Sequence, residues 1–380
     1  MQAKLRPAVR FVAITFLVAA CAATAAHAPT SLKQAFKGDF VVGAAINEAQ
    51  ISGQDKRGDA LIEAQFNSIS PENALKWESI HPEPGRYDFD VADQYVAFGQ
   101  EHHMFTVGHT LVWHNQVPVW VFQDDNGNLL TRDALLARLK DHIDTVVGRY
   151  KGKIDSWDVV NEALNDDGTM RQSLWYKIIG PDYVEKAFEY AHEADPQAQL
   201  TYNDYNLENE AKLKGAVALV KDLQAKGIPI SCVGIQGHDH LDWPSPEQMD
   251  TAISTLGALG VKVAITEFDI TVLPNAGRQP TADVTLKVQQ NASLNPYVSG
   301  LPDSIQQALA NRYAALMGVF VKHRDVVERV TFWGVTDGDS WLNDWPVRGR
   351  TNYPLLFDRD GRPKPAYDAV IKVASDAKNH

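Results

Sequence analysis

The chain has 380 residues and a net charge of −12 at pH 7. This acidic balance disfavours a polyanionic partner such as nucleic acid and suits neutral or cationic ligands. Hydrophobic residues make up 44% of the sequence, enough for a large buried core, whereas the two cysteines, Cys21 and Cys232, lie far apart. Since Cys21 falls within the leader described next, the mature chain can form no intrachain disulfide and depends on that core for stability.

Residues 1–28 predict an export signal. Basic residues precede the apolar stretch FVAITFLVAA, and small residues follow it up to AHA at Ala28; such a segment is removed after export and is too short to span a membrane. The sequence LVAAC supports a second interpretation, because it resembles a bacterial lipoprotein signal in which Cys21 is lipidated as the first mature residue. The protein is therefore expected to be exported, either secreted or periplasmic, or an outer-membrane lipoprotein.

Residues 29–380 predict a single domain, because they contain no Ser/Thr/Pro-rich spacer and no long repeat. Within them, β-branched apolar runs end in polar residues and alternate with amphipathic stretches. In chain order the eight runs are FVVGAAIN, FNSISPEN, MFTVGHTLVWH, IDSWDVVNE, LTYNDYN, CVGIQGHDH, VKVAITEFD and VTFWGVTD.

Helix-like segments separate these runs. The stretch 131–150 predicts a helix capped by Thr131, and the stretch 181–194 predicts a helix that begins at Pro181. Strands that alternate with helices are typical of a parallel sheet. Eight strands that read as buried on both faces, with no second core, favour a single (β/α)8 TIM barrel over an open doubly wound sheet. The weakly periodic stretch 273–302 is interpreted as an elaborated loop after the seventh strand.

Two glutamates follow predicted strands. Glu162 ends the fourth run, in SWDVVNEAL, and Glu267 ends the seventh, in VAITEFDI. The C-terminal strand ends of a barrel form its active face, so these two side chains could face each other across a cleft. Such a pair suits cleavage of a glycosidic bond, because one acid protonates the leaving oxygen and the other attacks the anomeric carbon or activates water. The alternative is a salt bridge from each glutamate to a lysine or arginine at the rim.

Neighbouring residues distinguish the two glutamates. His238 ends the sixth run, beside the seventh strand, so its imidazole could reach Glu267, with Asp269 on its far side. Held between carboxylates, the histidine would keep Glu267 ionised as a nucleophile, whereas Glu162, next to Trp157, Asn161 and substrate, would have a raised pKa suited to an acid. A purely structural histidine is the alternative.

Aromatic and polar residues near other strand ends suit a sugar ligand. Flat indoles match the apolar faces of pyranose rings, and three tryptophans fall at or just after strand ends, namely Trp113, Trp333 and Trp341. The loop PENALKW supplies donors and acceptors for a polyhydroxylated ligand from Glu72, Asn73 and Lys76. The alternatives are core packing for the tryptophans and ordinary solvation for the loop charges.

The histidines also suggest a metal centre as a competing hypothesis. Its ligands would come from HDH, with His238 and His240, and from GHTLVWH, with His109 and His114. His238 and His240 share one face of an extended strand, but no third partner stands at a recognisable metal-ligand spacing. We therefore predict that the site uses no metal.

Seven motifs, in order along essentially the whole mature chain, resemble those of glycoside hydrolase family 10, the endo-β-1,4-xylanases: PENALKW, GHTLVWH, WDVVNEAL, YNDYN, GIQGH, ITEFDI and TFWGVTD. The resemblance implies a (β/α)8 barrel that hydrolyses internal β-1,4-xylosidic bonds of xylan and xylooligosaccharides. It implies retention of anomeric configuration, by double displacement through a glycosyl-enzyme, without a metal or organic cofactor. A monomer with no protein partner is expected. A β-1,4-glucanase and a non-catalytic carbohydrate-binding barrel are the alternative functions.

The resemblance also assigns roles to residues. The family's acid/base glutamate falls on Glu162 and its nucleophile on Glu267. Asn161 matches the residue that contacts the sugar 2-hydroxyl in the subsite just before the cleavage point, and His238, backed by Asp269, matches the partner of the nucleophile. The remaining walls of that subsite match Lys76, His109, Trp113, Gln236, Trp333 and Trp341.

Residues farther from the cleavage point match as well. Glu72 and Asn73 correspond to the next glycone subsite, and Tyr205 corresponds to the leaving-group side. Two positions depart from the family pattern. Phe268 stands where Leu, Ile or Tyr is more usual, and Cys232 lacks the partner with which some members form a disulfide.

Overall fold

The computed structural model describes residues 31–275, 285, 287–289 and 291–378. The export signal, with its processing sites at Ala28 and Cys21, lies outside the described residues, as does part of the loop predicted at 273–302. Secretion and lipidation therefore stay predictions. No helix in the described ranges is long and apolar enough to cross a membrane.

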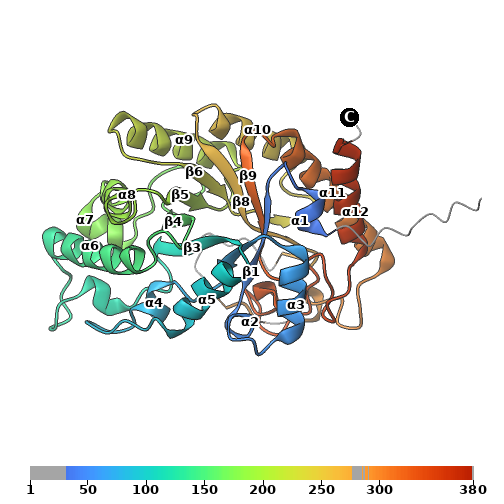
Figure 1. The fold of residues 1–380 in the computed structure, drawn as a ribbon, viewed down its shortest axis with the longest axis horizontal. Coiled ribbons are helices and arrows are strands. Elements are labelled where there is room, and N and C mark those ends of the chain that lie inside the picture. Colours follow the sequence, from blue (N-terminus) through green and yellow to red (C-terminus); the bar gives the residue numbers. More distant parts are fainter. Residues whose placement is uncertain (1–30, 276–284, 286, 290, 379–380) are drawn as a thin grey trace, which may run out of the picture. The chain divides into compact units, whose positions relative to one another are not determined.

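The strands form a closed parallel barrel, with helices around it (Figure 1). Each strand pairs in parallel with its neighbours around the ring; β9 pairs with β1, and β6 with β8. The short β7 continues the sixth barrel position and pairs with the end of β8. The predicted (β/α)8 fold is confirmed, and the open sheet is excluded because the ring closes. The strands are β1 (Val41–Ile46), β2 (Ser68–Pro71), β3 (Phe105–Val112), β4 (Ser156–Asn161), β5 (Gln199–Asp204), β6 (Cys232–Ile235), β7 (His238–His240), β8 (Lys262–Thr271) and β9 (Val327–Phe332).

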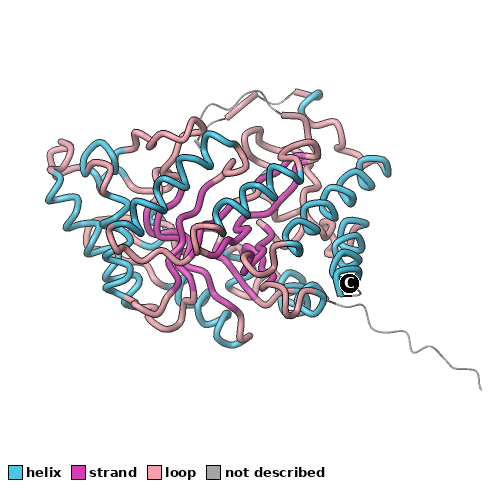
Figure 2. The backbone as a smooth tube through the Cα atoms, turned by 90° about the horizontal axis from the view of Figure 1, so that it is seen from above, coloured by secondary structure: helices cyan, strands magenta, loops and turns pink. Residues whose placement is uncertain are grey.

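Helices surround the strands in the view of Figure 2. The α-helices of the described chain are α1 (Leu32–Ala35), α2 (Glu48–Ile51), α3 (Lys56–Gln65), α4 (Trp77–Ile80), α5 (Asp90–Glu101), α6 (Arg132–Arg149), α7 (Leu174–Ile179), α8 (Tyr183–Ala194), α9 (Glu210–Ala225), α10 (Pro246–Gly257), α11 (Asp303–Lys322) and α12 (Pro365–Lys378). Short 3-10 turns are η1 (Val119–Phe122), η2 (Ala292–Leu294) and η3 (Trp341–Asn343).

Both helices predicted above are present. Thr131 caps α6, because its hydroxyl accepts a hydrogen bond from the Ala134 N–H at 3.4 Å. The helix predicted to begin at Pro181 begins at Tyr183, with Asp182 as its N-cap residue. The proline therefore precedes the cap and does not occupy the first helical position.

Alternation along β8 separates the catalytic face from the core. Glu267 lines the cavity at the barrel mouth, whereas the next residue, Phe268, is fully buried. The Phe268 ring packs edge-on against Tyr313 and Phe320 of α11, at centroid distances of 5.1 and 5.4 Å. Because successive strand side chains point to opposite faces, the unusual Phe268 fills the layer between barrel and helices and leaves Glu267 in place.

The barrel interior is more polar than the apolar runs predict. His109 Nδ1 lies 2.9 Å from Asp158 Oδ2 inside the barrel, and both residues are buried. Arg329, which is 1% exposed, donates to Thr331 Oγ1 at 2.9 Å. Buried polar groups are tolerated where they bond one another. These pairs therefore occupy inward positions that we expected to be apolar.

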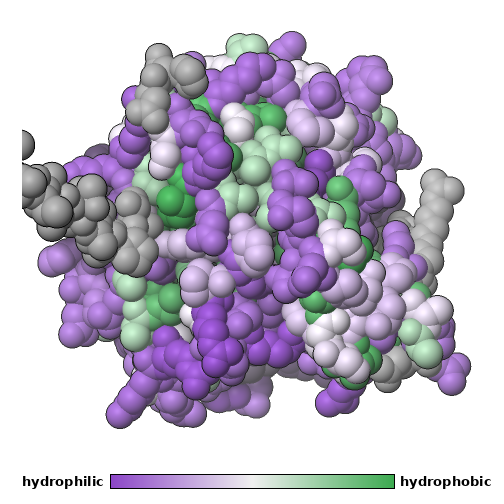
Figure 3. All heavy atoms as spheres, turned by 90° about the vertical axis from the view of Figure 1, so that its right-hand side faces the viewer, coloured by the Kyte–Doolittle hydropathy of each residue, from purple (hydrophilic) through white to green (hydrophobic). Residues whose placement is uncertain are grey.

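The chain between β8 and α11 contains, among its described residues, the single turn η2 and no other helix or strand. This agrees with the predicted loop. The face shown in Figure 3 presents mainly hydrophilic side chains, with small apolar areas between them. The apolar residues are concentrated instead between the barrel and its helices.

Candidate active site

A cavity of about 480 Å³ opens at the C-terminal strand ends, within the size range of ligand sites. All fourteen residues singled out from the sequence line it. They are Glu72, Asn73, Lys76, His109, Trp113, Asn161, Glu162, Tyr205, Gln236, His238, Glu267, Asp269, Trp333 and Trp341.

Glu162 directly follows β4 and is 6% exposed. Its Oε1 accepts a hydrogen bond from the Gln236 amide at 3.1 Å. Burial raises the pKa of Glu162 to about 6, and the nearby charge of Asp204 adds to the increase, while hydrogen bonds to Trp113 and Gln236 oppose it. Trp157, expected beside this carboxyl, does not line the cavity but packs over Gly108 in the hydrophobic core. The raised pKa thus has other causes than that indole.

Glu267 has the opposite environment. Asn203 donates to its Oε1 at 2.7 Å, and His238 Nε2 lies 3.1 Å from its Oε2. Burial alone would raise the pKa of Glu267, but the hydrogen bond to His238 and the charges of His109 and His238 hold it below its usual value. Hydrogen bonds and positive charge favour the ionised form of a carboxyl. These contacts therefore favour the ionised form of Glu267.

His238 links Glu267 to a second carboxylate. Its Nδ1 lies 3.0 Å from Asp269 Oδ1, and Trp341 donates its indole N–H to Asp269 Oδ2 at 2.9 Å. Burial opposes protonation of the imidazole, but Asp269 and Glu267 raise the pKa of His238 to about 10. The histidine is thus cationic at neutral pH, and the predicted arrangement between two carboxylates is confirmed.

Neither glutamate pairs with a lysine or arginine in the part of the chain that the structure describes. The salt bridges there give Glu267 only His238, at 3.1 Å, and Glu162 only His114 Nδ1, at 3.9 Å. The rim salt-bridge alternative is therefore wrong for both. Within the same residues, no group of three or more His, Cys, Asp or Glu side chains is arranged to hold a metal ion.

Three side-chain amides connect the two carboxyls. Asn161 Oδ1 accepts from Asn203 Nδ2 at 3.0 Å and from Gln236 Nε2 at 3.2 Å. Since Asn203 also donates to Glu267 and Gln236 to Glu162, a chain of amides runs from one carboxyl to the other. Sequence reasoning missed Asn203, although its place near the end of the fifth run, in YNDYN, was the available signal.

Gly234 makes room for this amide. A Cβ on Gly234 would lie 2.3 Å from Asn203 Oδ1 and 2.8 Å from Thr266 Cγ2. Thr266 itself donates to Asn203 Oδ1 at 2.6 Å. Gly234, the first glycine of the motif GIQGH, thus permits the close approach that holds Asn203 against Glu267.

Gly234→Ala is expected to push Asn203 away from Glu267. Because a hydrogen bond to the ionised carboxyl is then lost, kcat/KM on xylan should fall by about tenfold and its acid limb should move to higher pH. Steady-state kinetics between pH 3 and 7 measure both effects. Gly318→Ala is the matched control, because a Cβ at Gly318 of α11 meets nothing within 4 Å. An unshifted acid limb in Gly234→Ala would count against this role for Asn203.

The loop after β2 forms one end of the cavity. Lys76 Nζ donates to Asn73 Oδ1 at 3.0 Å and to Gln116 Oε1 at 2.8 Å, and lies 5.0 Å from the centre of a Trp113 ring. Burial lowers the pKa of Lys76, although the charge of Glu72 opposes this shift. Gln116, which the sequence analysis did not single out, fixes the ammonium from the loop after β3.

Tryptophans form the other walls. Trp333 contacts His109 edge-on at 5.3 Å, and Trp341 stacks on Trp345 at 4.8 Å with an interplanar angle of 19°. All four residues and Trp113 line or border the cavity, so their rings serve the site and are not packed in the core alone. Trp345 and Arg350, five residues apart in the same loop, also line the cavity. Trp345 was not predicted as a site residue from the sequence.

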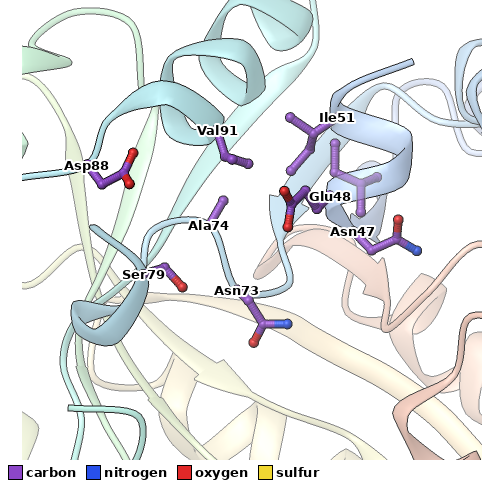
Figure 4. A pocket seen from close by; sticks show the side chains of 9 residues that line it. Asn47, Glu48, Ile51, Asn73, Ala74, Ser79, Asp88 and Val91 are labelled. Atoms are coloured by element: carbon purple, nitrogen blue, oxygen red, sulfur yellow. The ribbon is translucent and has the colours of Figure 1, made fainter. Parts of the chain in front are cut away.

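A second, smaller cavity of about 260 Å³ adjoins this end of the site and shares Asn73 with it. Figure 4 shows side chains around it from the segment after β1, from the loop after β2 together with α4, and from the chain at the start of α5. Its polar side chains are Asn47, Glu48, Asn73, Ser79 and Asp88. The cavity surface around Asn73 therefore extends beyond the site residues that were predicted from the sequence.

A barrel with two buried carboxyls of opposite pKa shift at its mouth, walled by indoles and amides, has the features of a glycoside hydrolase. The model of glycosyl hydrolase family 10 matches residues 31–373.

Relatives agree along most of the chain. Endo-1,4-beta-xylanase A of Xylanibacter ruminicola is 46% identical over 352 residues, which cover 93% of this chain and 95% of that protein. Endo-1,4-beta-xylanase of Geobacillus stearothermophilus is 42% identical, over 90% of this chain and 98% of its own. A solved GH10 endoxylanase from a sugarcane soil metagenome superposes with a TM-score of 0.86 at 44% identity, covering 91% of this chain and 99% of that one. The chain belongs to glycosyl hydrolase family 10, a retaining, xylan-hydrolysing family, and is an endo-1,4-β-xylanase.

Proposed function

We propose that Glu267 is the nucleophile and Glu162 the acid/base with which this chain hydrolyses internal bonds of xylan and xylooligosaccharides. The opposite surroundings of the two buried carboxyls carry the assignment. Two donors, Asn203 and the cationic His238, keep Glu267 ionised, whereas burial and Asp204 keep Glu162 protonated up to about pH 6.

The first step forms a glycosyl-enzyme. Glu267 attacks the anomeric carbon as the glycosidic bond breaks, and Glu162 gives its proton to the leaving oxygen. His238, held by Asp269, orients the attacking carboxylate and balances its charge. Asn161 is placed between the two carboxyls, where its amide can contact the 2-hydroxyl of the sugar under attack.

The second step releases the sugar. Glu162, now a carboxylate, removes a proton from water, and the water oxygen attacks the anomeric carbon while Glu267 leaves. Two displacements at one carbon restore the original configuration. No proton transfer in either step requires a group beyond these two carboxyls and water.

The remaining predicted residues bind the chain of sugars. Lys76, His109, Trp113, Gln236, Trp333 and Trp341 surround the sugar under attack, Glu72 and Asn73 bind the next sugar on the glycone side, and Tyr205 lies on the leaving-group side. A solved relative was obtained as a mutant in complex with xylotriose, and it superposes with a TM-score of 0.80 at 37% identity. That complex supports xylooligosaccharides as ligands of this cleft.

Initial rates on xylan and on carboxymethylcellulose test the sugar preference. Lys76 is fixed by Asn73 and Gln116 and covered by Trp113, which leaves little freedom to admit the hydroxymethyl group of glucose. We expect xylan to be hydrolysed at least about tenfold faster. Equal rates on the two polymers would identify an enzyme of mixed specificity, and product formed only from the cellulose derivative would overturn the proposal.

A further inference from the structure

The backbone at Glu162 has an unusual conformation. Its φ is +58°, in the left-handed region that residues with a side chain rarely adopt. Successive strand residues point to opposite faces, yet Asn161 and Glu162 both line the cavity. The left-handed turn is what brings the second of these side chains to the same cavity. Such a conformation persists only where surrounding contacts hold it.

Arg171 supplies most of those contacts from one side. Its Nε–H donates to the carbonyl oxygen of Glu162 at 2.9 Å, and its Nη2 donates to that of Leu164 at 3.1 Å. Its own backbone N–H donates to the carbonyl oxygen of Ala163 at 2.7 Å. Three consecutive carbonyls after β4 therefore bond to one residue, which is 9% exposed, so water has little access to replace it.

Strand β5 holds the same segment from the other side. The Glu162 N–H donates to the carbonyl oxygen of Asn203 at 2.9 Å, and the Leu164 N–H donates to Asp204 Oδ2 at 3.3 Å. These bonds fix the amide groups of the turn but not its carbonyls. Arg171 is thus the side chain that completes the support of the turn.

The same guanidinium also reaches the leaving-group side of the cleft. Arg171 Nη2 donates to the Tyr205 hydroxyl at 2.8 Å. The Tyr205 ring is held on a second side by Lys212, whose Nζ lies 3.2 Å from the ring centre. One side chain therefore connects the backbone of Glu162 with the Tyr205 wall.

We infer that Arg171 is a positioning residue, which holds the carboxyl of Glu162 and the ring of Tyr205 in one arrangement for protonation of the leaving sugar. The inference rests on the proposed role of Glu162. A lysine could not make these bonds together, because they need the forked donors of a guanidinium. Loss of Arg171 should therefore impair proton donation more than attack by Glu267.

Leaving groups of different basicity separate these two effects. A 2,4-dinitrophenolate departs without a proton, whereas phenolate needs one. We expect Arg171→Met to lower kcat/KM on phenyl β-xylobioside by about 10²-fold, since a small misplacement of a catalytic group has an effect of that size. On 2,4-dinitrophenyl β-xylobioside the loss should be only about threefold, because general acid assistance is not used.

Arg138→Met is the matched control. Arg138 also donates to three backbone carbonyls, those of Trp120, Val121 and Gln123, but outside the cavity. Its loss should lower the unfolding temperature without any dependence on the leaving group. An equal loss on both aryl glycosides in Arg171→Met, or no loss on either, would overturn the inference.

Two further variants keep the result decisive. Arg171→Lys retains the positive charge and replaces Arg171→Met if the latter does not fold. It should show the same leaving-group dependence to a smaller degree. Equal losses on the two glycosides in folded Arg171→Lys would contradict the positioning role. Glu162→Ala is measured in the same series. If it lacks leaving-group dependence, the proposed acid/base is wrong; if it shows the dependence and the Arg171 variants do not, only the inference about Arg171 fails.

Discussion

Glu267→Ala is expected to lower kcat on xylan by at least about 10⁴-fold, because no other group in the cavity can replace a carboxylate that forms the covalent intermediate. His238 Nε2 and one N–H of Asn203 Nδ2 would lose their acceptor and face the empty position. Release of reducing sugar from xylan measures the loss. Calorimetric binding of xylotriose serves as the control, since a folded variant with intact walls should still bind it.

Azide gives this variant a distinct chemical signature. With the nucleophile removed, azide can occupy its place and attack an activated xylobioside once, which gives the α-glycosyl azide by a single inversion. Glu267→Gln is a less suitable variant, because its NH2 group would replace one carboxyl oxygen and so face either the Asn203 amide or the protonated His238, both of which are donors. Turnover of xylan near the wild-type rate in Glu267→Ala would show that the nucleophile is another residue.

The main residues of the reaction centre could be predicted from the sequence because their positions follow one rule of the barrel fold. Polar residues at the C-terminal ends of barrel strands point to the mouth, and this rule alone predicts that Glu162, Glu267 and His238 lie there. The sixth and seventh strands are adjacent in chain order. His238, at the end of the sixth, must therefore lie near Glu267 and Asp269 at the end of the seventh. Resemblance to family motifs supplied the individual roles.

The groups that the sequence did not reveal act through contacts between distant segments. Asn203 stands at a strand end like Glu162, but its importance depends on the space that Gly234 leaves for it on the neighbouring strand. Arg171 lies in a loop, nine residues after Glu162. Neither periodicity nor strand position marks it, because its function depends on where the loop folds back.

The direction of the pKa shift at Glu162 was predicted correctly, but Trp157, one of the neighbours expected to cause it, does not lie beside the carboxyl. Trp157 was expected to desolvate the carboxyl, yet alternation along β4 turns that indole toward Gly108. Burial in the cavity and the charge of Asp204 raise the pKa instead. Asp204 also forms a buried ion pair with Lys212, whose Nζ lies 2.8 Å from its Oδ1, so the residue that helps to raise this pKa is held in place from α9.

Glu162→Ala is expected to separate the two steps of the reaction. Protonation of the leaving oxygen contributes about 10² to 10⁴-fold to the rate, so hydrolysis of xylan should fall within that range. An activated aryl xylobioside still forms the glycosyl-enzyme on Glu267, but water attacks it slowly without a base. The intermediate should then accumulate, and a rapid release of the aryl group should precede slow turnover.

Azide should restore turnover in Glu162→Ala, because this anion needs no base and can attack the glycosyl-enzyme in the space left by the carboxyl. The product should be the β-glycosyl azide, since attack on the intermediate is the second of two inversions, whereas Glu267→Ala should give the α-azide. The anomeric proton signals of the two products distinguish them. The reverse assignment of anomers would mean that the roles of the two glutamates are exchanged, and the same anomer from both variants would mean that one of them does not have the proposed role.

The pH dependence provides an independent check on the same residue. Glu162 must be protonated for the first step, so kcat/KM of the wild-type enzyme on xylan should fall as the pH rises through the pKa of about 6 in the free enzyme. Glu267 must be ionised, and its lowered pKa places the acid limb below 4.5. In Glu162→Ala the alkaline limb near pH 6 should disappear while the acid limb remains. If the alkaline limb persists unchanged in this variant, the group that titrates there is not Glu162.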